Sequence, residues 1–160
     1  MQKTLPVRKN IRLKGYDYSQ AGCYFVTLCV KDGHEMLWVP MPVGAHIVRP
    51  PLSGVGQTVE NAVESIAKIY AMVAVDKYVI MPNHVHMIIV VNCDHGRTMC
   101  APTISRVIKQ CKEHVTKQIG YSICQKSYHD HIIRDEDEYK RIWQYIEENP
   151  ASWAEDEYHT

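Results

Sequence analysis

The chain has 160 residues, 46% of them hydrophobic, which is enough for one domain with a buried core. Its 18 Lys and Arg residues balance 18 Asp and Glu residues, so the formal net charge at pH 7 is zero. It has no apolar run of about 18 residues and no signal-peptide core, which argues against a membrane span or an export signal. We therefore expect one cytoplasmic domain over 1–160, in which 1–14 form a basic arm and 151–160 an acidic tail.

Charge is unevenly distributed along this neutral chain. Residues 1–14 hold five basic side chains and no acid, whereas 135–160 hold nine acids and two basic side chains. Such asymmetry permits a nucleic-acid partner without requiring one, and a solvated arm and a solvated acidic helix explain it equally well. The six cysteines form no Cys-x-x-Cys pair, which argues against a zinc ribbon or a thioredoxin-type redox site.

The first third of the chain predicts a strand, a loop and a helix. β-Branched and aromatic residues over 23–30 are typical of a strand. Prolines and glycines recur over 32–56, which predicts a loop. Apolar residues at helical spacing then predict an amphipathic helix over 58–70, with Thr58 near its start as a cap.

The rest of the chain predicts three further strands and two helices. Strands are expected over 72–81, 84–91 and 127–134, and helices over 103–119 and 135–149. The resulting order of strand, helix, strand, strand, helix, strand and helix is that of an α+β ferredoxin-like (RRM-like) sandwich. It predicts an antiparallel sheet with an added C-terminal helix.

Two histidines separated by one residue open the predicted strand over 84–91. Alternate residues of a strand point to the same face, so the imidazoles of His84 and His86 should lie side by side, as metal ligands do. Random placement of 9 His residues already yields about 0.5 His-x-His matches, and His129 and His131 form a second one. The turn signal before His84 and the strand-forming run after His86 favour the first pair.

The predicted last helix offers two polar side chains at the edge of its apolar stripe. That stripe is expected to consist of Tyr139, Ile142, Trp143 and Ile146. Tyr145 and Asn149 lie one turn apart on the flank, where both can reach into a cleft. The alternative is that Tyr145 covers the edge of the core.

Three segments together resemble a known family. The motif MPNHVH (81–86), the helix ISRVIKQCKEHVTKQI (104–119) and the segment HIIRDEDEYKRIWQYIEENP (131–150) are similar to those of single-tyrosine HUH transposases. The likeness is strongest to REP-associated tyrosine transposases and insertion-sequence transposases. The chain departs from the pattern at Asn149, where related enzymes often have Gln, and at Cys124, where they commonly have Trp.

The resemblance implies a DNA transposase that cleaves and rejoins single-stranded DNA, at hairpin-flanked sites, through a 5′-phosphotyrosine intermediate. It implies Tyr145 on a catalytic helix as nucleophile, His84, His86 and Asn149 as ligands, and Mg²⁺ or Mn²⁺ as the divalent ion. Such an ion polarises the scissile phosphate, and the phenolate attacks phosphorus without consuming water. The expected partner is hairpin DNA, and the expected state is a monomer or homodimer.

The expected DNA contacts are basic side chains. The acid-free arm is the first choice, and the basic face of the helix over 103–119 is the fallback surface. The residues concerned are Arg8, Lys9, Arg12 and Lys14 in the arm, and Arg106 and Lys109 in the helix.

Two other interpretations stay open at this point. One is a non-catalytic ferredoxin-like RNA- or DNA-binding module, which would stack bases on sheet-face aromatics such as Tyr24 and Phe25. The other is a structural zinc site formed by His129, His131 and a cysteine, although their spacing does not support it.

Overall fold

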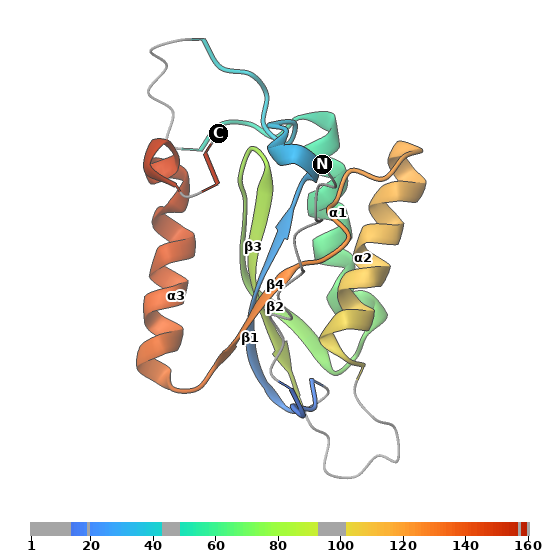
Figure 1. The fold of residues 1–160 in the computed structure, drawn as a ribbon, viewed down its shortest axis with the longest axis vertical. Helices are drawn as coiled ribbons and strands as arrows, with labels where there is room; N and C mark the ends of the chain where they lie inside the picture. The colour runs from blue at the N-terminus through green and yellow to red at the C-terminus, as the bar shows by residue number, and fades with distance from the viewer. Residues whose placement is uncertain (1–13, 19, 43–48, 93–101, 157, 160) are drawn as a thin grey trace, which may run out of the picture.

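The computed structural model describes residues 14–18, 20–42, 49–92, 102–156 and 158–159. These residues form a sheet with helices on both faces (Figure 1). The strands are β1 (Gly22–Cys29), β2 (Val73–Ile80), β3 (His84–Val91) and β4 (His129–Ile133). The α-helices are α1 (Gly54–Ile69), α2 (Ile104–Ile119) and α3 (Glu136–Glu148), and two 3₁₀ segments are η1 (Lys31–Gly33) and η2 (Asn149–Glu155).

The sheet confirms the α+β ferredoxin-like prediction. Its strand order is β2-β3-β1-β4, and all three pairings are antiparallel. The N-terminal strand therefore lies in the middle of the sheet, beside the strand that carries the histidine pair. This pairing places His86 opposite Thr27 and His84 opposite Cys29.

The two faces of the sheet have separate cores, because alternate strand residues point to opposite sides. Val85, Met87 and Ile89 face α1 and α2, which lie together on one side of the sheet (Figure 1). Ile88 and the histidines face α3 on the other side, where the smaller core contains Ile146. The histidine pair thus lies between the sheet and the C-terminal helix.

Helix α1 begins earlier than predicted. Ser53 caps it by accepting a hydrogen bond from the Gly56 backbone N–H at 3.0 Å, and the Thr58 hydroxyl instead donates to the Gly54 carbonyl. The prediction that Thr58 is the cap was wrong. The first turn of the helix contains Gly54 and Gly56, which are not typical helix residues, so the sequence pattern did not mark it as helical. Gly56 is required there, since a Cβ at this position would lie 2.0 Å from the Leu37 carbonyl oxygen.

The other predicted helix ends agree closely with the structure. Thr103 accepts from the Arg106 N–H to cap α2, and Gly120 ends it in the left-handed conformation at φ 94°. Asp135 caps α3 by accepting from the Glu138 N–H, and three acids in the first turn suit the positive end of the helix dipole. Pro150 is the second residue of η2, which follows α3 directly, so the chain continues as 3₁₀ helix past the predicted stop.

The buried stripe of α3 differs from the prediction at one residue. Ile146 is fully buried, but Trp143 is 40% exposed, with the Lys77 ammonium 4.0 Å from its ring centroid. The stripe runs through Ile142, Ile146 and Asn149 instead, at i, i+4 and i+7. The prediction was wrong because it assigned the apolar Trp143 to the buried stripe on polarity alone. The buried position is instead taken by the polar Asn149, whose side chain lines the cavity.

No helix in the described part of the chain is long and apolar enough to cross a membrane.

Candidate active site

The two histidines of β3 are completely enclosed. His84 is 0% exposed and His86 is 1% exposed, although imidazole is a polar group that costs free energy to bury without partners. Their Nε2 atoms face each other at 3.0 Å. The strand periodicity that predicted this convergence holds because β3 is regular from His84 onward.

Each imidazole is held from behind through its Nδ1 atom. His84 Nδ1 lies 2.8 Å from Asn83 Oδ1, and His86 Nδ1 lies 2.8 Å from Thr27 Oγ1. Both partners are themselves 3% exposed. The Nδ1 contacts fix the ring planes and aim both Nε2 atoms into the same space, which is how metal-binding histidines are oriented.

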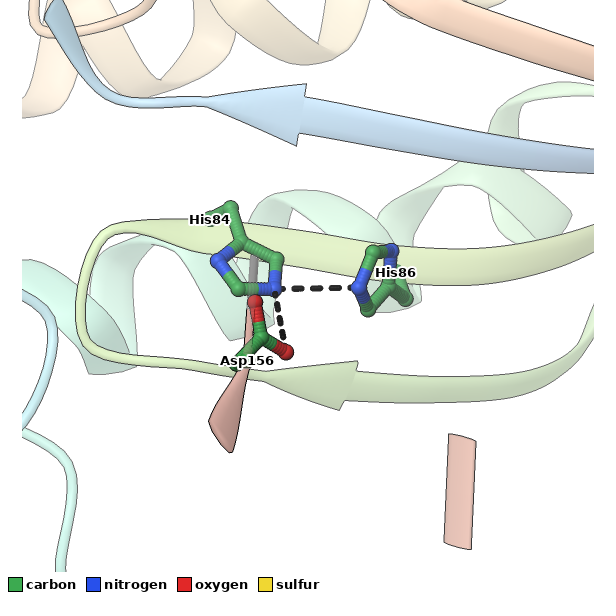
Figure 2. A group of neighbouring side chains, drawn as sticks. All are labelled: His84, His86 and Asp156. Atoms are coloured by element: carbon green, nitrogen blue, oxygen red, sulfur yellow. Dashed lines mark hydrogen bonds and ion pairs between the residues drawn. The ribbon is translucent and has the colours of Figure 1, made fainter. Parts of the chain in front are cut away.

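An acidic side chain from the C-terminal segment meets this pair. Asp156 Oδ2 lies 3.9 Å from His84 Nε2, and Figure 2 shows the carboxylate beside the His84 ring. Donor atoms of His84, His86 and Asp156 all lie within 4.8 Å of one another. Within the described residues this is the sole group of three or more His, Cys, Asp or Glu side chains close enough to hold an ion.

Burial keeps the imidazoles uncharged. Desolvation lowers the pKa of His84 to about 4, against a smaller opposing effect of the Asp156 carboxylate. Desolvation also lowers the pKa of His86, and the neighbouring His84 adds to that effect. A neutral imidazole keeps one nitrogen lone pair that can bind a metal ion, so neither ring has to lose its charge before it acts as a ligand at neutral pH.

Tyr145 reaches the same place from α3. Its hydroxyl lies 3.3 Å from His86 Nε2, and its ring lies against His86 at a centroid distance of 5.3 Å. Phe25 on β1 packs edge-on against the Tyr145 ring and also lies over His86. The phenol is 41% exposed, so its oxygen lies at the border between the enclosed histidines and solvent.

Asn149 begins η2, one turn beyond Tyr145. It is 4% exposed, and its Oδ1 atom has no hydrogen-bond partner among the described residues. The Oδ2 atom of Asp156 is also buried and also has no hydrogen-bond partner among the described residues. Buried oxygens left without donors are costly unless something else binds them. A cation at the two imidazoles would supply that interaction to Asp156, and Asn149 lines the same cavity as His86, so the residues present fit a divalent metal ion.

A cavity of about 640 Å³ opens beside these groups, between β1, β4 and the end of α3. Its lining includes four acids and neither Lys nor Arg among the described residues. A phosphate entering such a cavity meets negative charge, which a bound cation would offset. The lining residues are Phe25, Thr27, His86, His129, Asp130, His131, Tyr145, Glu148, Asn149, Ser152, Glu155, Asp156 and Tyr158.

The structure brings together four of the predicted site residues. Tyr145 and Asn149 line the cavity with His86, and His84 is in contact with His86. The basic residues are elsewhere. Arg106 and Lys109 are exposed on α2, across the sheet from α3, and Lys14 is exposed near the start of the described chain (Figure 1). Arg8, Lys9 and Arg12 lie outside the described residues.

Sequence reasoning missed Asp156, Asn83 and Thr27. Asp156 lies in the segment predicted to be an acidic tail, and nothing in its spacing marks it as a ligand. The sequence pattern marks Asn83 only as part of a turn. Its position next to His84 was the available signal, since a metal-binding histidine usually has a hydrogen-bond partner at its second ring nitrogen.

The structure weakens both other interpretations. Tyr24 is 0% exposed and belongs to the core under α1 and α2, so it is not available for base stacking; Phe25 does line the cavity. His131 pairs with Glu138 at 2.5 Å, and no described cysteine joins His129 and His131.

Comparison with known proteins adds a relative and a fold. No protein-family model matches the chain. An uncharacterised protein of Haemophilus influenzae is 33% identical over 172 aligned residues, covering 94% of this chain and 92% of the relative. The chain belongs to the same family as this Haemophilus protein.

The solved structures show which fold this family has. A REP-associated tyrosine transposase bound to a REP hairpin superposes with a TM-score of 0.64 at 19% identity, covering 89% of this chain and 74% of that one. A candidate transposase from Deinococcus radiodurans R1 superposes with a TM-score of 0.50 at 18% identity, covering 85% and 95%. The chain therefore has the fold of single-tyrosine HUH transposases, as its motifs predict.

Proposed function

We propose that this chain is a metal-dependent DNA transposase that cleaves and rejoins single-stranded DNA through a 5′-phosphotyrosine intermediate. The observation that carries the proposal is the Tyr145 hydroxyl 3.3 Å from His86 Nε2, at the mouth of a cavity whose described lining holds neither Lys nor Arg. A pure binding module has no reason to direct a phenol at a buried imidazole pair. The shared fold with a REP-associated tyrosine transposase supports the same class of activity.

His84 and His86 are proposed to hold a divalent ion, Mg²⁺ or Mn²⁺, with an oxygen from Asn149 or Asp156. Both oxygens are buried and lack hydrogen bonds among the described residues. When bound, the ion would polarise the scissile phosphate and offset the negative charge of its transition state. The Nε2 atoms of both imidazoles face the space that the ion would occupy.

Tyr145 is proposed as the nucleophile. Its phenol loses a proton, its oxygen forms a bond to phosphorus, and the P–O3′ bond breaks. The departing 3′ oxygen takes up a proton, which leaves a free 3′-hydroxyl and balances the proton lost by the phenol. The new phosphodiester keeps the free energy of the broken one, so the 3′-hydroxyl can reverse the reaction on the same or another strand. Phe25 orients the phenol, because its edge-on contact restricts the tyrosine ring.

The proposed substrate is single-stranded DNA at hairpin-flanked sites. The structural relative was solved bound to a REP hairpin, and the chain's acid-free basic arm offers phosphate contacts that the described cavity lining does not. Arg8, Lys9, Arg12 and Lys14 are the proposed contacts, and Arg106 and Lys109 are the fallback surface if the arm does not bind DNA. We keep the expectation of a single cytoplasmic domain that acts as a monomer or homodimer.

The decisive experiment incubates the purified chain with a labelled single-stranded hairpin and Mn²⁺, followed by a denaturing gel. We expect a covalent protein–DNA adduct that disappears on chelation. Tyr145→Phe should abolish the adduct while leaving folding and DNA binding nearly intact, since it removes one oxygen from a half-exposed ring. His84→Ala and His86→Ala should lose the adduct together with its metal dependence.

Three outcomes would contradict these assignments. An adduct that persists in Tyr145→Phe would assign the nucleophile to another residue, with Tyr139 and Tyr128 tested next. Unchanged cleavage in all three variants would mean that the proposed site does not catalyse it. Binding of DNA without any adduct from the wild-type chain would favour the non-catalytic nucleic-acid-binding module.

A further inference from the structure

The two imidazoles of the site are held by partners of different kinds. Asn83, the residue before His84, presents an amide, whose oxygen only accepts and whose nitrogen only donates hydrogen bonds. Thr27, opposite His86, presents a hydroxyl that can do either. This difference determines where each ring carries its proton.

The polarity of the Asn83 amide is fixed by its surroundings. Its Nδ2 atom donates to the Gly33 carbonyl at 3.2 Å and to the Tyr158 carbonyl at 2.7 Å, so both N–H groups are used. A flipped amide would put its oxygen against two carbonyl oxygens. The Oδ1 atom therefore faces His84 Nδ1 at 2.8 Å, and since this oxygen can only accept, Nδ1 must carry the proton.

A neutral His84 protonated on Nδ1 has a bare Nε2. That atom lies 3.0 Å from His86 Nε2, and two lone pairs cannot face each other at this distance in a buried site. In the metal-free protein His86 Nε2 must then carry the proton and donate it to His84. The Tyr145 oxygen, 3.3 Å from the same nitrogen, can share this N–H as an acceptor. His86 Nδ1 is left bare and accepts from the Thr27 hydroxyl.

We propose that Asn83 presets His84 as an Nε2 ligand in the metal-free protein, whereas His86 is switched into a ligand by metal binding, with Thr27 as its adjustable partner. When an ion takes the Nε2 lone pair of His86, the proton leaves Nε2 for Nδ1, and the Thr27 hydroxyl turns from donor to acceptor. The protein neither takes up nor releases a proton overall. The metal-bound half rests on the proposed function; the preset state of His84 does not.

Asn83 and Thr27 are thus positioning residues that act through the histidines. Removing a hydrogen-bond partner that orients a metal-binding histidine typically changes metal affinity by about 10–100-fold. An amide with fixed polarity also explains why Asn suits position 83. Asp would keep an acceptor for His84 but would lose both donations to backbone carbonyls.

Nitrogen-15 correlation spectra of the histidine rings test the preset state without metal or DNA. In the chelator-treated wild-type protein at neutral pH, we expect His84 protonated on Nδ1 and His86 on Nε2. His84 protonated on Nε2 would overturn the proposal. Because this measurement uses the unmodified protein, it decides the question even where a variant fails to fold.

Variants at Asn83 assign the cause. Asn83→Leu removes the acceptor and should release His84 to the Nε2-protonated form, whereas Asn83→Asp keeps an acceptor and should retain the Nδ1-protonated form. Pro82→Ala, in the same turn, is the matched control and should leave the spectrum of His84 unchanged. An unchanged His84 tautomer in folded Asn83→Leu would overturn the role of Asn83.

Zn²⁺, which is diamagnetic and binds imidazole, tests the switch. On saturation the proton of His86 should appear on Nδ1 while His84 stays as it was. Thr27→Val should weaken Zn²⁺ binding by at least about 10-fold without altering His84, and Thr27→Ser should restore it. A His86 protonated on Nδ1 before Zn²⁺ is added would contradict the switch. Tight Zn²⁺ binding with no DNA cleavage would count against the proposed function alone.

Discussion

At the scale of single residues, the site combines two uncharged imidazoles with two oxygens that lack donors among the described residues. Burial of His84 and His86 removes the option of protonation near neutral pH, and their Nε2 atoms converge at 3.0 Å. The oxygens of Asn149 and Asp156 are the candidates for a third ligand. They differ in charge, and a carboxylate oxygen of Asp156 lies within 4.8 Å of a ring nitrogen of each histidine.

We expect Asp156→Ala to weaken Mn²⁺ binding to the DNA-free protein by at least about 10-fold, because it removes the carboxylate within reach of His84 Nε2. Asn149→Ala should have the smaller effect. Calorimetric titration with Mn²⁺ measures both. The reverse ranking would make Asn149 the third ligand, as the family resemblance implies.

The free energy of unfolding should fall as the pH decreases from about 6.5 to 4 in the metal-free protein. The pKa of His84 is about 4 in the folded chain and about 6.5 when unfolded, so the unfolded chain binds the proton first. The stability linked to this group is complete above pH 6.5, and it is about 3 kcal/mol smaller at pH 4.

Urea unfolding at pH 7 and pH 4.5, in chelator, measures this dependence. His84→Gln is the matched comparison, because it keeps a polar side chain but removes the titrating ring. Its stability should depend less on pH over this interval than that of the wild type. Parallel dependence in the two proteins would mean that His84 does not stay neutral when folded.

At the scale of elements, α3 sets the distance between the Tyr145 phenol and the histidine pair. The helix rests on the sheet through a small core in which Ile146 is fully buried, next to Tyr145 in the chain. Its start is fixed by the Asp135 cap, and Glu138 also accepts from the Arg134 N–H and contacts His131. The position of the Tyr145 phenol therefore depends on how its neighbour Ile146 packs against the sheet.

We expect Ile146→Ala to destabilise the chain by about 2–5 kcal/mol, because it leaves a cavity under α3. It should also reduce adduct formation by allowing Tyr145 to move. Trp143→Ala, on the exposed side of the same helix, should cost less than about 1 kcal/mol, mainly the interaction with Lys77. Thermal unfolding measures the stability of the two variants, and the adduct assay measures their activity. Equal losses of stability in the two variants would contradict the described orientation of α3.

At the scale of the whole molecule, the exposed basic side chains of α2 and the candidate active site lie on opposite faces of the sheet. The cavity face carries acids, whereas Arg106 and Lys109 lie on α2 across the sheet (Figure 1). A strand bound in the cavity therefore needs its phosphate contacts from another part of the chain. The basic arm is rich in cations for its length and holds no acid.

Deleting residues 1–14 should weaken binding of single-stranded hairpin DNA and flatten its salt dependence, by about 0.7 in the log–log slope for each phosphate that the arm neutralises. Arg106→Ala with Lys109→Ala removes two cations from the opposite layer and should leave the slope nearly unchanged. Fluorescence anisotropy across a salt series measures both proteins. If only the double variant had a flattened salt dependence, the DNA-binding surface would be α2 and not the arm.

The fold and the central residues of the site could be predicted from the amino-acid sequence. Hydrophobic period, caps and turns are local properties, so the element order, the shared face of His84 and His86, and the helix carrying Tyr145 followed from spacing. The same local reasoning placed Trp143 in the core, because apolarity alone does not say how a helix is rotated on its sheet.

The groups that meet the histidines followed from tertiary packing instead. Asp156 is 70 residues from His86 in the chain and Thr27 is 59 residues away, so their contacts depend on how the C-terminal segment folds back and how β1 pairs with β3. The polarity of Asn83 likewise comes from two distant carbonyls. Contacts between residues so distant in the chain leave no periodic pattern in the sequence, because they arise from tertiary packing and not from the geometry of a single helix or strand.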